Sequence, residues 1–325
     1  MTVCLAISNQ SIADAAALLQ KGQLVAFPTE TVYGLGADAT DAAAVARIFA
    51  AKQRPAFNPL ISHVATAEAA FALGQKTPIA AALAAAFWPG PLTLILQRSS
   101  DCPVAMLTTA GLDRLGIRVP AHDGARRLLT AFAKPIAAPS ANPSGQISPS
   151  RAEHVVKGLD GKVELVLDGG ACENGLESTI VDCTGARARL LRPGGVTRDA
   201  LAAALTAAGC DPEIDIAAPL GNDEKPLAPG QLASHYAPNS SVRLMAKSRD
   251  GNEELIGFGT VQGAGKLGLN LSPSGDLIEA AANLFSMLHA ADAVNAETIA
   301  IAPIPVDGLG EAINDRLRRA AAPRA

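Results

Sequence analysis

The chain has few aromatic residues and few charges for its length. Of its 325 residues, 3% are Phe, Trp or Tyr and 18% are charged, while 49% are hydrophobic. We therefore expect a folded protein whose core consists of Ala, Leu, Val and Ile, and a length better suited to two domains than to one. The net charge of -4 argues against an evenly basic nucleic-acid-binding surface, although it leaves room for a local basic cleft.

Cysteine pairs and long apolar runs are also missing. The five cysteines are odd in number and none lies in a Cys-x-x-Cys pair, so disulfide frameworks and structural zinc fit poorly and a reducing cytoplasm fits well. No apolar run approaches the ~20 residues that a membrane span needs. The first residues lack the basic and apolar regions of a secretory signal. We expect a cytoplasmic protein that does not contact a membrane.

Three common catalytic signatures are absent from the sequence. It has no His-x-x-x-His pair, no Gly-x-Ser-x-Gly elbow and no Gly-x-x-x-x-Gly-Lys-Ser/Thr loop. A zinc enzyme and a Ser-His-Asp hydrolase are therefore disfavoured. Any nucleotide must be bound by an architecture other than the usual phosphate loop.

Strand-like and helix-like patterns interleave irregularly through the first two thirds of the chain. Leu24–Phe27 and Leu60–Val64 are short apolar runs typical of buried strands, and Asp41–Ala51 has helical spacing with Thr40 as a suitable N-cap. The irregular order favours a mixed sheet over a strict βαβ series. We predict an α/β domain over residues 1–209.

Periodicity disappears between about Cys210 and Pro238, where Asp, Glu, Pro, Gly and Asn dominate. The second half of this segment places a His-Tyr pair between prolines, unlike a flexible Gly/Ser spacer. We predict an ordered linker over residues 210–240, followed by a small three-layer α/β domain over 241–325. In that domain, strands are expected at Val242–Met245, Leu255–Phe258, Leu267–Leu271 and Thr298–Ile301, and helices at Asp276–His289 and Leu309–Ala320.

Residues 28–63 hold the most informative group of polar side chains. P-T-E-T-V-Y-G-L-G precedes a short Ala-rich helix, and Lys52, Arg54, Asn58 and His63 follow it. A core does not need that mixture, whereas a site that holds phosphates beside a small polar substrate does. Lys52 and Arg54 can form a phosphate clamp, although cations at a helix end also compensate the helix dipole.

Other cations lie at strand ends. Arg114 and Arg118 flank Gly116 and would project to one face of a strand, and Arg192 ends an apolar strand before Pro193. Each of these could be an ordinary surface charge. Together with the Lys-x-Arg pair, in a domain with so few charges, they favour an anion site.

Hydroxyl and amide side chains gather in two further segments. Ser140 and Asn142 lie in a proline-framed loop that could offer donors to a phosphate, although a capped turn has the same composition. Ser148 lies just downstream, and Ser178 precedes a buried strand from which it could reach the same cleft. His63 ends a strand, and a lone histidine of this kind is more often structural.

Taken together, the motifs resemble those of the YrdC-type family of L-threonylcarbamoyladenylate synthases, in the long form with an extra C-terminal domain. The signatures occur in the family's order along essentially the whole chain: P-T-E-T-V-Y-G-L-G, K-x-R-P, N-P-L, G-x-R-x-P, P-S-A-N-x-S-G, E-S-T-I-V-D and L-R-P-G. The A-P-G-x-x-x-x-H-Y-A-P linker and the tail G-L-G-E-A-I-N-D-R-L-R-R-A-A resemble the long form specifically. The resemblance implies a twisted mixed sheet with helices in the first domain and a Rossmann-like second domain.

The resemblance also implies a nucleotidyltransferase. Such an enzyme makes threonylcarbamoyl-AMP and pyrophosphate from L-threonine, bicarbonate and ATP, for threonylcarbamoyladenosine modification of tRNA. A partner, the tRNA threonylcarbamoyl transferase, then uses the product. Mg²⁺ is expected to bind through the ATP phosphates, with no metal ligand from the protein and no organic cofactor.

By similarity, specific residues are implied for each substrate. The threonine pocket is expected to contain Thr31, His63, Arg118 and Ser178. ATP is expected to contact Lys52, Arg54, Asn58, Arg114, Ala138, Ser140, Asn142, Ser148 and Arg192, with Tyr236 closing over the site. Lys52, Arg54 and His63 are expected nearest to the chemistry, in which positioning and charge neutralisation replace a protein nucleophile. Whether His63, bicarbonate or water takes the proton of the threonine amine stays open.

Two alternatives to the synthase are less compatible with the sequence. A double-stranded-RNA or ribosome-binding module could use the same basic cleft, but it would not need Thr31, Asn58 or Ser178, and the acidity of the chain disfavours it. A carbamoyl-transfer or hydrogenase-maturation enzyme would carry zinc or acylphosphatase-like modules, which the sequence lacks. Direct binding of tRNA is left open.

Overall fold

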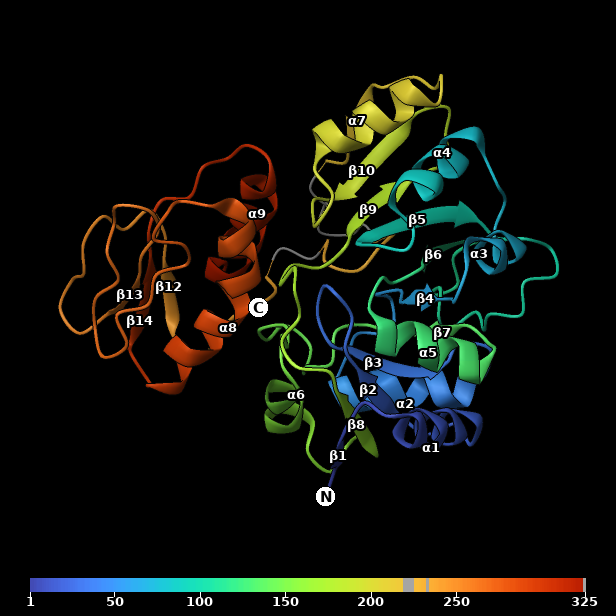
Figure 1. Ribbon diagram of the computed structural model, residues 1–325, viewed down its shortest axis with the longest axis horizontal. Helices are drawn as coiled ribbons and strands as arrows, with labels where there is room; N and C mark the ends of the chain where they lie inside the picture. Colours follow the sequence, from blue (N-terminus) through green and yellow to red (C-terminus); the bar gives the residue numbers. More distant parts are fainter. Residues whose placement is uncertain (219–224, 232–233, 324–325) are drawn as a thin grey trace.

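The computed structural model describes residues 1–218, 225–231 and 234–323. Two α/β bodies lie side by side, the first around a large sheet and the second, orange to red in Figure 1, around a small one. The predicted α/β organisation is confirmed. Parts of the predicted linker, residues 219–224 and 232–233, lie outside the described residues.

The large sheet is mixed, as predicted. Within the described residues it has the order β1-β8-β2-β3-β7-β4-β6-β5-β9-β10-β11. For example, β4 is parallel to β6 and β6 is antiparallel to β5. The strands are β1 (Val3–Ala6), β2 (Val25–Phe27), β3 (Gly34–Asp38), β4 (Ile61–His63), β5 (Leu92–Gln97), β6 (Arg114–Arg118), β7 (Ile136–Ala137), β8 (Leu165–Asp168), β9 (Thr179–Asp182), β10 (Ala188–Arg192) and β11 (Ile214–Ile216).

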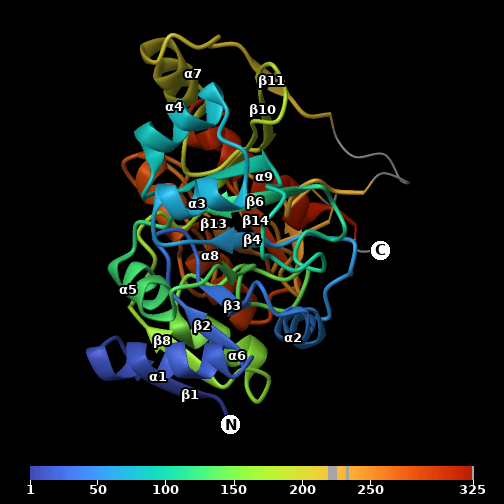
Figure 2. The ribbon, with the colours of Figure 1, turned by 90° about the vertical axis from the view of Figure 1, so that its right-hand side faces the viewer.

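Helices cover this sheet, with α1 packed on α5 and α4 packed on α7 (Figure 2). They are α1 (Asn9–Gln20), α2 (Ala42–Lys52), α3 (Ala67–Leu73), α4 (Pro78–Phe87), α5 (Asp123–Phe132), α6 (Ala152–Leu159) and α7 (Arg198–Ala207). Ala, Leu, Val and Ile dominate the largest buried cluster, as the scarcity of aromatic residues requires.

The helix α2 begins one residue later than predicted. Asp41, rather than Thr40, is its N-cap, and the Asp41 carboxylate accepts a 2.8 Å hydrogen bond from the Ala43 N–H. The Thr40 hydroxyl instead donates to Asp38 at 2.6 Å. At the other end, Gln53 adopts a left-handed conformation with φ 53°, which turns the chain so that Arg54 leaves the helix axis.

The second domain is built on three parallel strands in the order β12-β14-β13. These are β12 (Ser241–Arg243), β13 (Glu254–Ile256) and β14 (Thr298–Ile301), and the helices α8 (Leu277–Ala293) and α9 (Leu309–Ala321) lie between them and the first domain (Figure 1). The strand predicted at Leu267–Leu271 is wrong, because Gly268 turns back with φ 60° and the segment makes one isolated bridge, Gly257 to Asn270.

The predicted linker begins with a strand, β11, that its polar composition does not indicate. β11 pairs in parallel with β10, with Ala188 beside Ile214, and so extends the first sheet. Further on, the Ala237 N–H donates to Gly145 O at 2.8 Å and the His235 N–H donates to Arg319 O at 3.2 Å. The later part of the linker is thereby attached to both domains.

The two domains share a buried apolar cluster. Val32, Ile147 and Leu176 of the first domain pack with Phe285 of α8 and with Tyr236 of the linker. The second domain therefore forms part of the wall beside the polar loops of the first. Among the described residues, we find no helix with the length and hydropathy of a membrane span.

Candidate active site

A pocket lined largely by polar side chains lies where the loop after β2 meets the ends of β4, β6 and β10 and the linker. Nine residues named from the sequence line it. They are Thr31, Arg54, His63, Arg118, Ala138, Ser140, Ser178, Arg192 and Tyr236. Segments far apart in the chain thus bring most of the predicted residues to one place.

The loop after β2 is held rigid by its own hydroxyls. The Thr29 hydroxyl donates to Val32 O at 2.7 Å and accepts from the Thr31 and Val32 N–H groups at 3.2 Å. Its oxygen lies 2.7 Å from the Thr31 hydroxyl oxygen. This turn fixes Thr31 at the pocket wall, in contact with Arg118, whose Nη1 donates to the Thr31 hydroxyl at 2.9 Å.

Arg118 is oriented from several sides. Its Nη2 forms a 2.7 Å ion pair with the buried Glu30, and its Nε donates to Gly90 O at 3.2 Å. These bonds and the one to Thr31 use three of the five N–H donors of the guanidinium. Two donors remain without a partner in the described residues, enough for a bidentate bond to a substrate carboxylate.

His63 presents a neutral imidazole to one corner of the pocket, which Thr31, Arg118 and Ser178 also line. Its burial, followed by the nearby Arg118 charge, lowers the His63 pKa to about 3. The ring packs edge-on against Phe27 at 6.3 Å between centroids. Among the described residues, Nδ1 has no hydrogen-bond partner. Ser178 completes the corner, with its hydroxyl 2.7 Å from that of the buried Thr93.

Arg54 and Arg192 are buried cations that have no acidic partner among the described residues. The Arg54 guanidinium donates to Asn58 O at 3.1 Å and Pro59 O at 2.8 Å, and that of Arg192 donates to Ser178 O at 2.8 Å and Pro229 O at 3.2 Å. Within the described part of the chain, neither forms an ion pair with a carboxylate. Burial lowers the pKa of Arg54 to about 9 and also lowers that of Arg192. Two desolvated charges of one sign that line the same pocket favour the binding of an anion there.

Lys52 lies behind the pocket rather than in its wall. Its Nζ donates to Ser140 O and Asn142 O, both at 2.5 Å, and its backbone carbonyl accepts from the Ser144 N–H at 2.8 Å. Burial, followed by repulsion from Arg54, lowers the Lys52 pKa. In this arrangement Lys52 fixes the proline-framed loop, and its direct contact with phosphate stays a prediction.

Four more predicted residues lie outside the pocket lining. Asn58 is buried, and its amide has no side-chain partner in the described residues. Asn142 donates to Pro143 O and Gln146 O, both at 2.9 Å. Arg114, at the far end of β6, lies 3.5 Å from Asp182 in an ion pair. Ser148 is buried and donates to Glu177 at 2.6 Å.

The linker forms the remaining wall of the pocket. Pro229, Gly230, His235 and Tyr236 all line it. Tyr236 is 1% exposed. The centroid of its ring lies 5.7 Å from that of Phe285 and 5.3 Å from the guanidinium of Arg316 in α9. The docked linker predicted from the His-Tyr pair therefore lies beside the cation cluster.

Sequence reasoning missed the acidic residues of the site. Glu30 and Glu177 occur within the motifs quoted for the family, yet nothing in the sequence distinguished them from their neighbours. The signal that could have found them is the rule that buried arginines need counter-charges. Their partners, Arg118 and Arg316, are distant in the chain and become neighbours only through the fold.

Two family models match this chain. Residues 17–194 match one described as "Telomere recombination", and residues 196–322 match one described as "Threonylcarbamoyl-AMP synthase, C-terminal domain". The threonylcarbamoyl-AMP synthase of Pyrococcus abyssi is 41% identical over 97% of this chain and 95% of its own length. This chain belongs to the threonylcarbamoyl-AMP synthase family, in its two-domain form.

Other members support the same conclusion. The Bacillus subtilis threonylcarbamoyl-AMP synthase is 38% identical over 98% of this chain and 95% of its own length. A crystal structure of Pyrococcus abyssi Sua5 complexed with L-threonine superimposes with a TM-score of 0.87 at 38% identity, covering 99% of this chain and 97% of that one. The predicted family, enzyme class and α/β fold are confirmed.

Proposed function

We propose that this pocket joins L-threonine, bicarbonate and ATP into threonylcarbamoyl-AMP and pyrophosphate, as its threonylcarbamoyl-AMP synthase family implies. The observation that carries the residue assignment is the pair of buried guanidiniums, Arg54 and Arg192, which have no carboxylate partner in the described residues. They lie in the same pocket as the hydroxyl, imidazole and guanidinium groups of Thr31, Ser178, His63 and Arg118. A triphosphate and an amino acid carboxylate are the anions that such a pocket would pair.

In the proposed assignment, each side chain of the corner has a separate task. Arg118 binds the threonine carboxylate with its two remaining donors. Thr31 and Ser178 hydrogen-bond the polar groups of the substrate, and the neutral His63 ring can accept a hydrogen bond from its hydroxyl or amine. Because His63 has a pKa of about 3, it stays uncharged and does not repel the ammonium form of the substrate.

The chemistry needs no protein nucleophile. The neutral threonine amine attacks bicarbonate, a C–N bond forms and water leaves, which yields a carbamate. A carbamate oxygen then attacks the α-phosphorus of ATP, and the bond to the bridging oxygen breaks with release of pyrophosphate. Arg54 and Arg192 would stabilise charge on the phosphates, and the rigid loops would hold the reactants in line.

Mg²⁺ is proposed to enter as part of the substrate. Among the described residues, no group of three or more His, Cys, Asp or Glu side chains is placed to hold a metal ion. A cation bound through the triphosphate oxygens suits such a site. It would share the neutralisation of phosphate charge with Arg54 and Arg192.

The product is a mixed anhydride of a carbamic acid and a phosphate. Such an anhydride is an activated donor of the threonylcarbamoyl group, and we propose that the enzyme that accepts it is the transferase that modifies adenosine in tRNA. The alternative, a module that binds double-stranded RNA or ribosomes, gains no support here. Arg54 and Arg192 are 8% and 4% exposed, and buried cations cannot contact a duplex backbone.

The product itself tests the proposal. The purified protein is incubated with ATP, Mg²⁺, L-threonine and ¹³C-labelled bicarbonate, and adenylated species are measured by mass spectrometry. We expect one adenylate that contains threonine and a single labelled carbon. A threonyl adenylate without the label would contradict the proposed use of bicarbonate.

A further inference from the structure

Among the described residues that line the pocket, Glu177 is the one carboxylate. Its exposed fraction is 6%. Burial alone would raise the Glu177 pKa, but the charges of Arg316 and Arg192 and the Ser148 hydroxyl lower it overall, so this carboxylate is ionised at neutral pH. A fixed negative charge in the wall of a triphosphate site weakens ATP binding unless a cation neutralises it.

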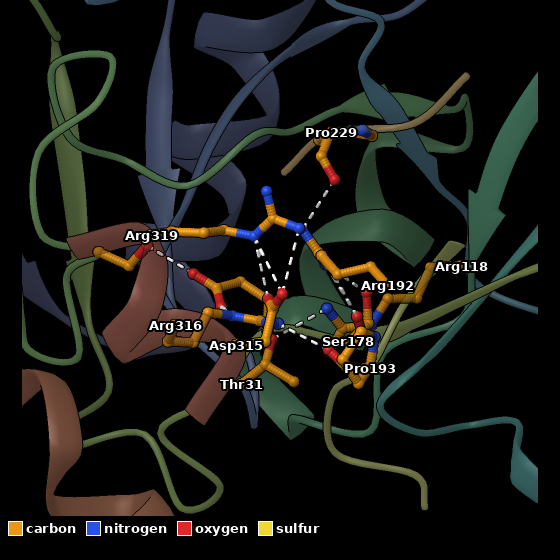
Figure 3. A network of polar contacts seen from close by, with 11 residues as sticks. Thr31, Arg118, Ser178, Arg192, Pro193, Pro229, Asp315, Arg316 and Arg319 are labelled. Atoms are coloured by element: carbon orange, nitrogen blue, oxygen red, sulfur yellow. Dashed lines mark hydrogen bonds and ion pairs between the residues drawn. The ribbon is translucent and has the colours of Figure 1, made fainter. Parts of the chain in front are cut away.

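The neutralising cation comes from the second domain. Arg316 of α9 is fully buried, and its Nε forms a 2.7 Å ion pair with the second carboxylate oxygen of Glu177. Its Nη2 donates to Pro193 O at 2.9 Å. In Figure 3, Arg316 lies beside Ser178, Arg192 and Pro193 of the first domain.

The other groups around Arg316 hold it in this position. Its Nη1 donates to Asp315 at 2.7 Å, and Asp315 is also bonded by Arg319 at 3.1 Å. The guanidinium lies 5.3 Å from the centroid of the Tyr236 ring, within the range of a cation–π contact. One side chain of α9 therefore touches the pocket carboxylate, the strand end that carries Arg192, and the linker.

We propose that Arg316 is a positioning residue of the active site, which makes the ATP subsite depend on the second domain by neutralising Glu177. The ion pair leaves one Glu177 oxygen free to accept from Ser148 at 2.6 Å, which fixes that hydroxyl at the edge of the predicted ATP site. It also leaves Arg54 and Arg192 as an uncancelled pair of charges for the phosphates. This inference rests on the proposed function for the identity of the anion.

Removing Arg316 would leave a specific charge uncompensated. In Arg316→Met, Asp315 keeps its bonds to Arg319, but Glu177 loses its ion pair and remains near Arg192. We expect the Kd of a non-hydrolysable ATP analogue to rise about 10- to 100-fold. The Kd of L-threonine should change less than about threefold, since Arg118 and Glu30 are untouched.

Rescue distinguishes a charge effect from a structural one. In Arg316→Met/Glu177→Gln, the carboxylate charge is gone while an oxygen remains to accept from Ser148. We expect most of the lost affinity for the ATP analogue to return. Arg316→Lys keeps the charge without the planar fork, so its affinity should lie nearer to the wild type than that of Arg316→Met.

The experiment uses calorimetric titration of the full chain, with thermal unfolding to establish that each variant is folded. The matched control is Arg198→Met, which removes a partly exposed ion pair between the same two domains, Arg198 to Glu311 at 2.9 Å, and should leave both Kd values unchanged. If Arg316→Met does not fold, Arg316→Lys and Glu177→Gln are titrated instead, and Glu177→Gln should bind the analogue at least as tightly as the wild type.

Two results would overturn the proposal. One is an Arg316→Met protein that weakens both ligands equally and gains nothing from Glu177→Gln. The other is a Glu177→Gln protein that binds the analogue more weakly than the wild type. Failure of the wild-type protein to make labelled product would refute the proposed function, whereas the pattern of Kd values would still test the role of Arg316.

Discussion

At the scale of single residues, the strongest feature of the site is the contrast between paired and unpaired arginines. Arg118 faces Glu30, whereas Arg54 and Arg192 donate to carbonyl oxygens within the described residues. The sequence predicted all three as site residues from their positions at the ends of strands and helices. It could not tell which of them has a carboxylate partner, because the partners meet only in the folded chain. The same holds for Lys52, because the Lys-x-Arg motif does not indicate that its side chain is buried against the proline-framed loop.

The first prediction concerns Arg54. Arg54→Ala removes a charge-assisted phosphate contact worth ~1.5–3 kcal/mol, so kcat/KM for ATP should fall by about 10- to 150-fold. Steady-state pyrophosphate release at varied ATP concentration measures this. Arg47→Ala changes an exposed arginine of α2, the helix that ends just before Arg54; it is the control and should have no effect. A loss below threefold for Arg54→Ala would remove this residue from the phosphate site.

At the scale of elements, sequence patterns located the long helices and the buried strands better than the short strands. β11 has only three residues and lies in a polar segment, so it gives no periodic signal and is stabilised by its pairing with β10. The Leu267–Leu271 run has apolar alternation but contains Gly268, whose left-handed conformation turns the chain. The N-cap of α2 was misplaced because Thr40 and Asp41 are equally good candidates, and the choice depends on Asp38, which binds Thr40.

The second prediction tests that N-cap. Asp41→Ala removes the acceptor for the Ala43 N–H, and the free energy of unfolding should fall by ~0.5–2 kcal/mol. Urea denaturation measures the change. Asp199→Ala removes a first-turn carboxylate from α7, which Thr197 caps instead, and should have a smaller effect. Equal losses in the two variants would mean that the Asp41 bond adds nothing beyond helix-dipole electrostatics.

At the scale of the whole molecule, the second domain is joined to the site by contacts that no local pattern predicts. Glu177 and Arg316 are 139 residues apart, and His154 of α6 stacks on His289 of α8 at 3.9 Å between ring centroids. The family motifs predicted the two domains and most residues of the pocket. They did not predict this junction, because each of its partners looks ordinary within its own segment.

The third prediction concerns acid stability and the histidine pair at this junction. Burial, with repulsion from Arg151, lowers the His154 pKa to about 4, and burial, with repulsion from His154, lowers that of His289 to about 4. The unfolded chain, with ordinary histidine pKa values near 6.5, therefore binds more protons in mild acid. The contribution of the two neutral histidines to the free energy of unfolding is complete above pH ~6.5 and is lost as the pH falls toward 4.

Urea denaturation at pH 7 and pH 5 tests the direction of this pH dependence. The wild-type free energy of unfolding should be lower at pH 5, and His154→Gln/His289→Gln should lose less between the two pH values. The comparison is made within each protein, so any loss of stability from the substitutions themselves does not affect it. The same pH dependence in both proteins would place the acid sensitivity elsewhere.

The proposed reaction is tested most directly by the dependence of pyrophosphate release on L-threonine and bicarbonate. The purified protein is given ATP and Mg²⁺, and L-threonine and bicarbonate are added separately and together. We expect rapid release only when both are present, because the carbamate is the nucleophile that displaces pyrophosphate. Release that is equally fast without threonine would contradict the proposed chemistry of the pocket.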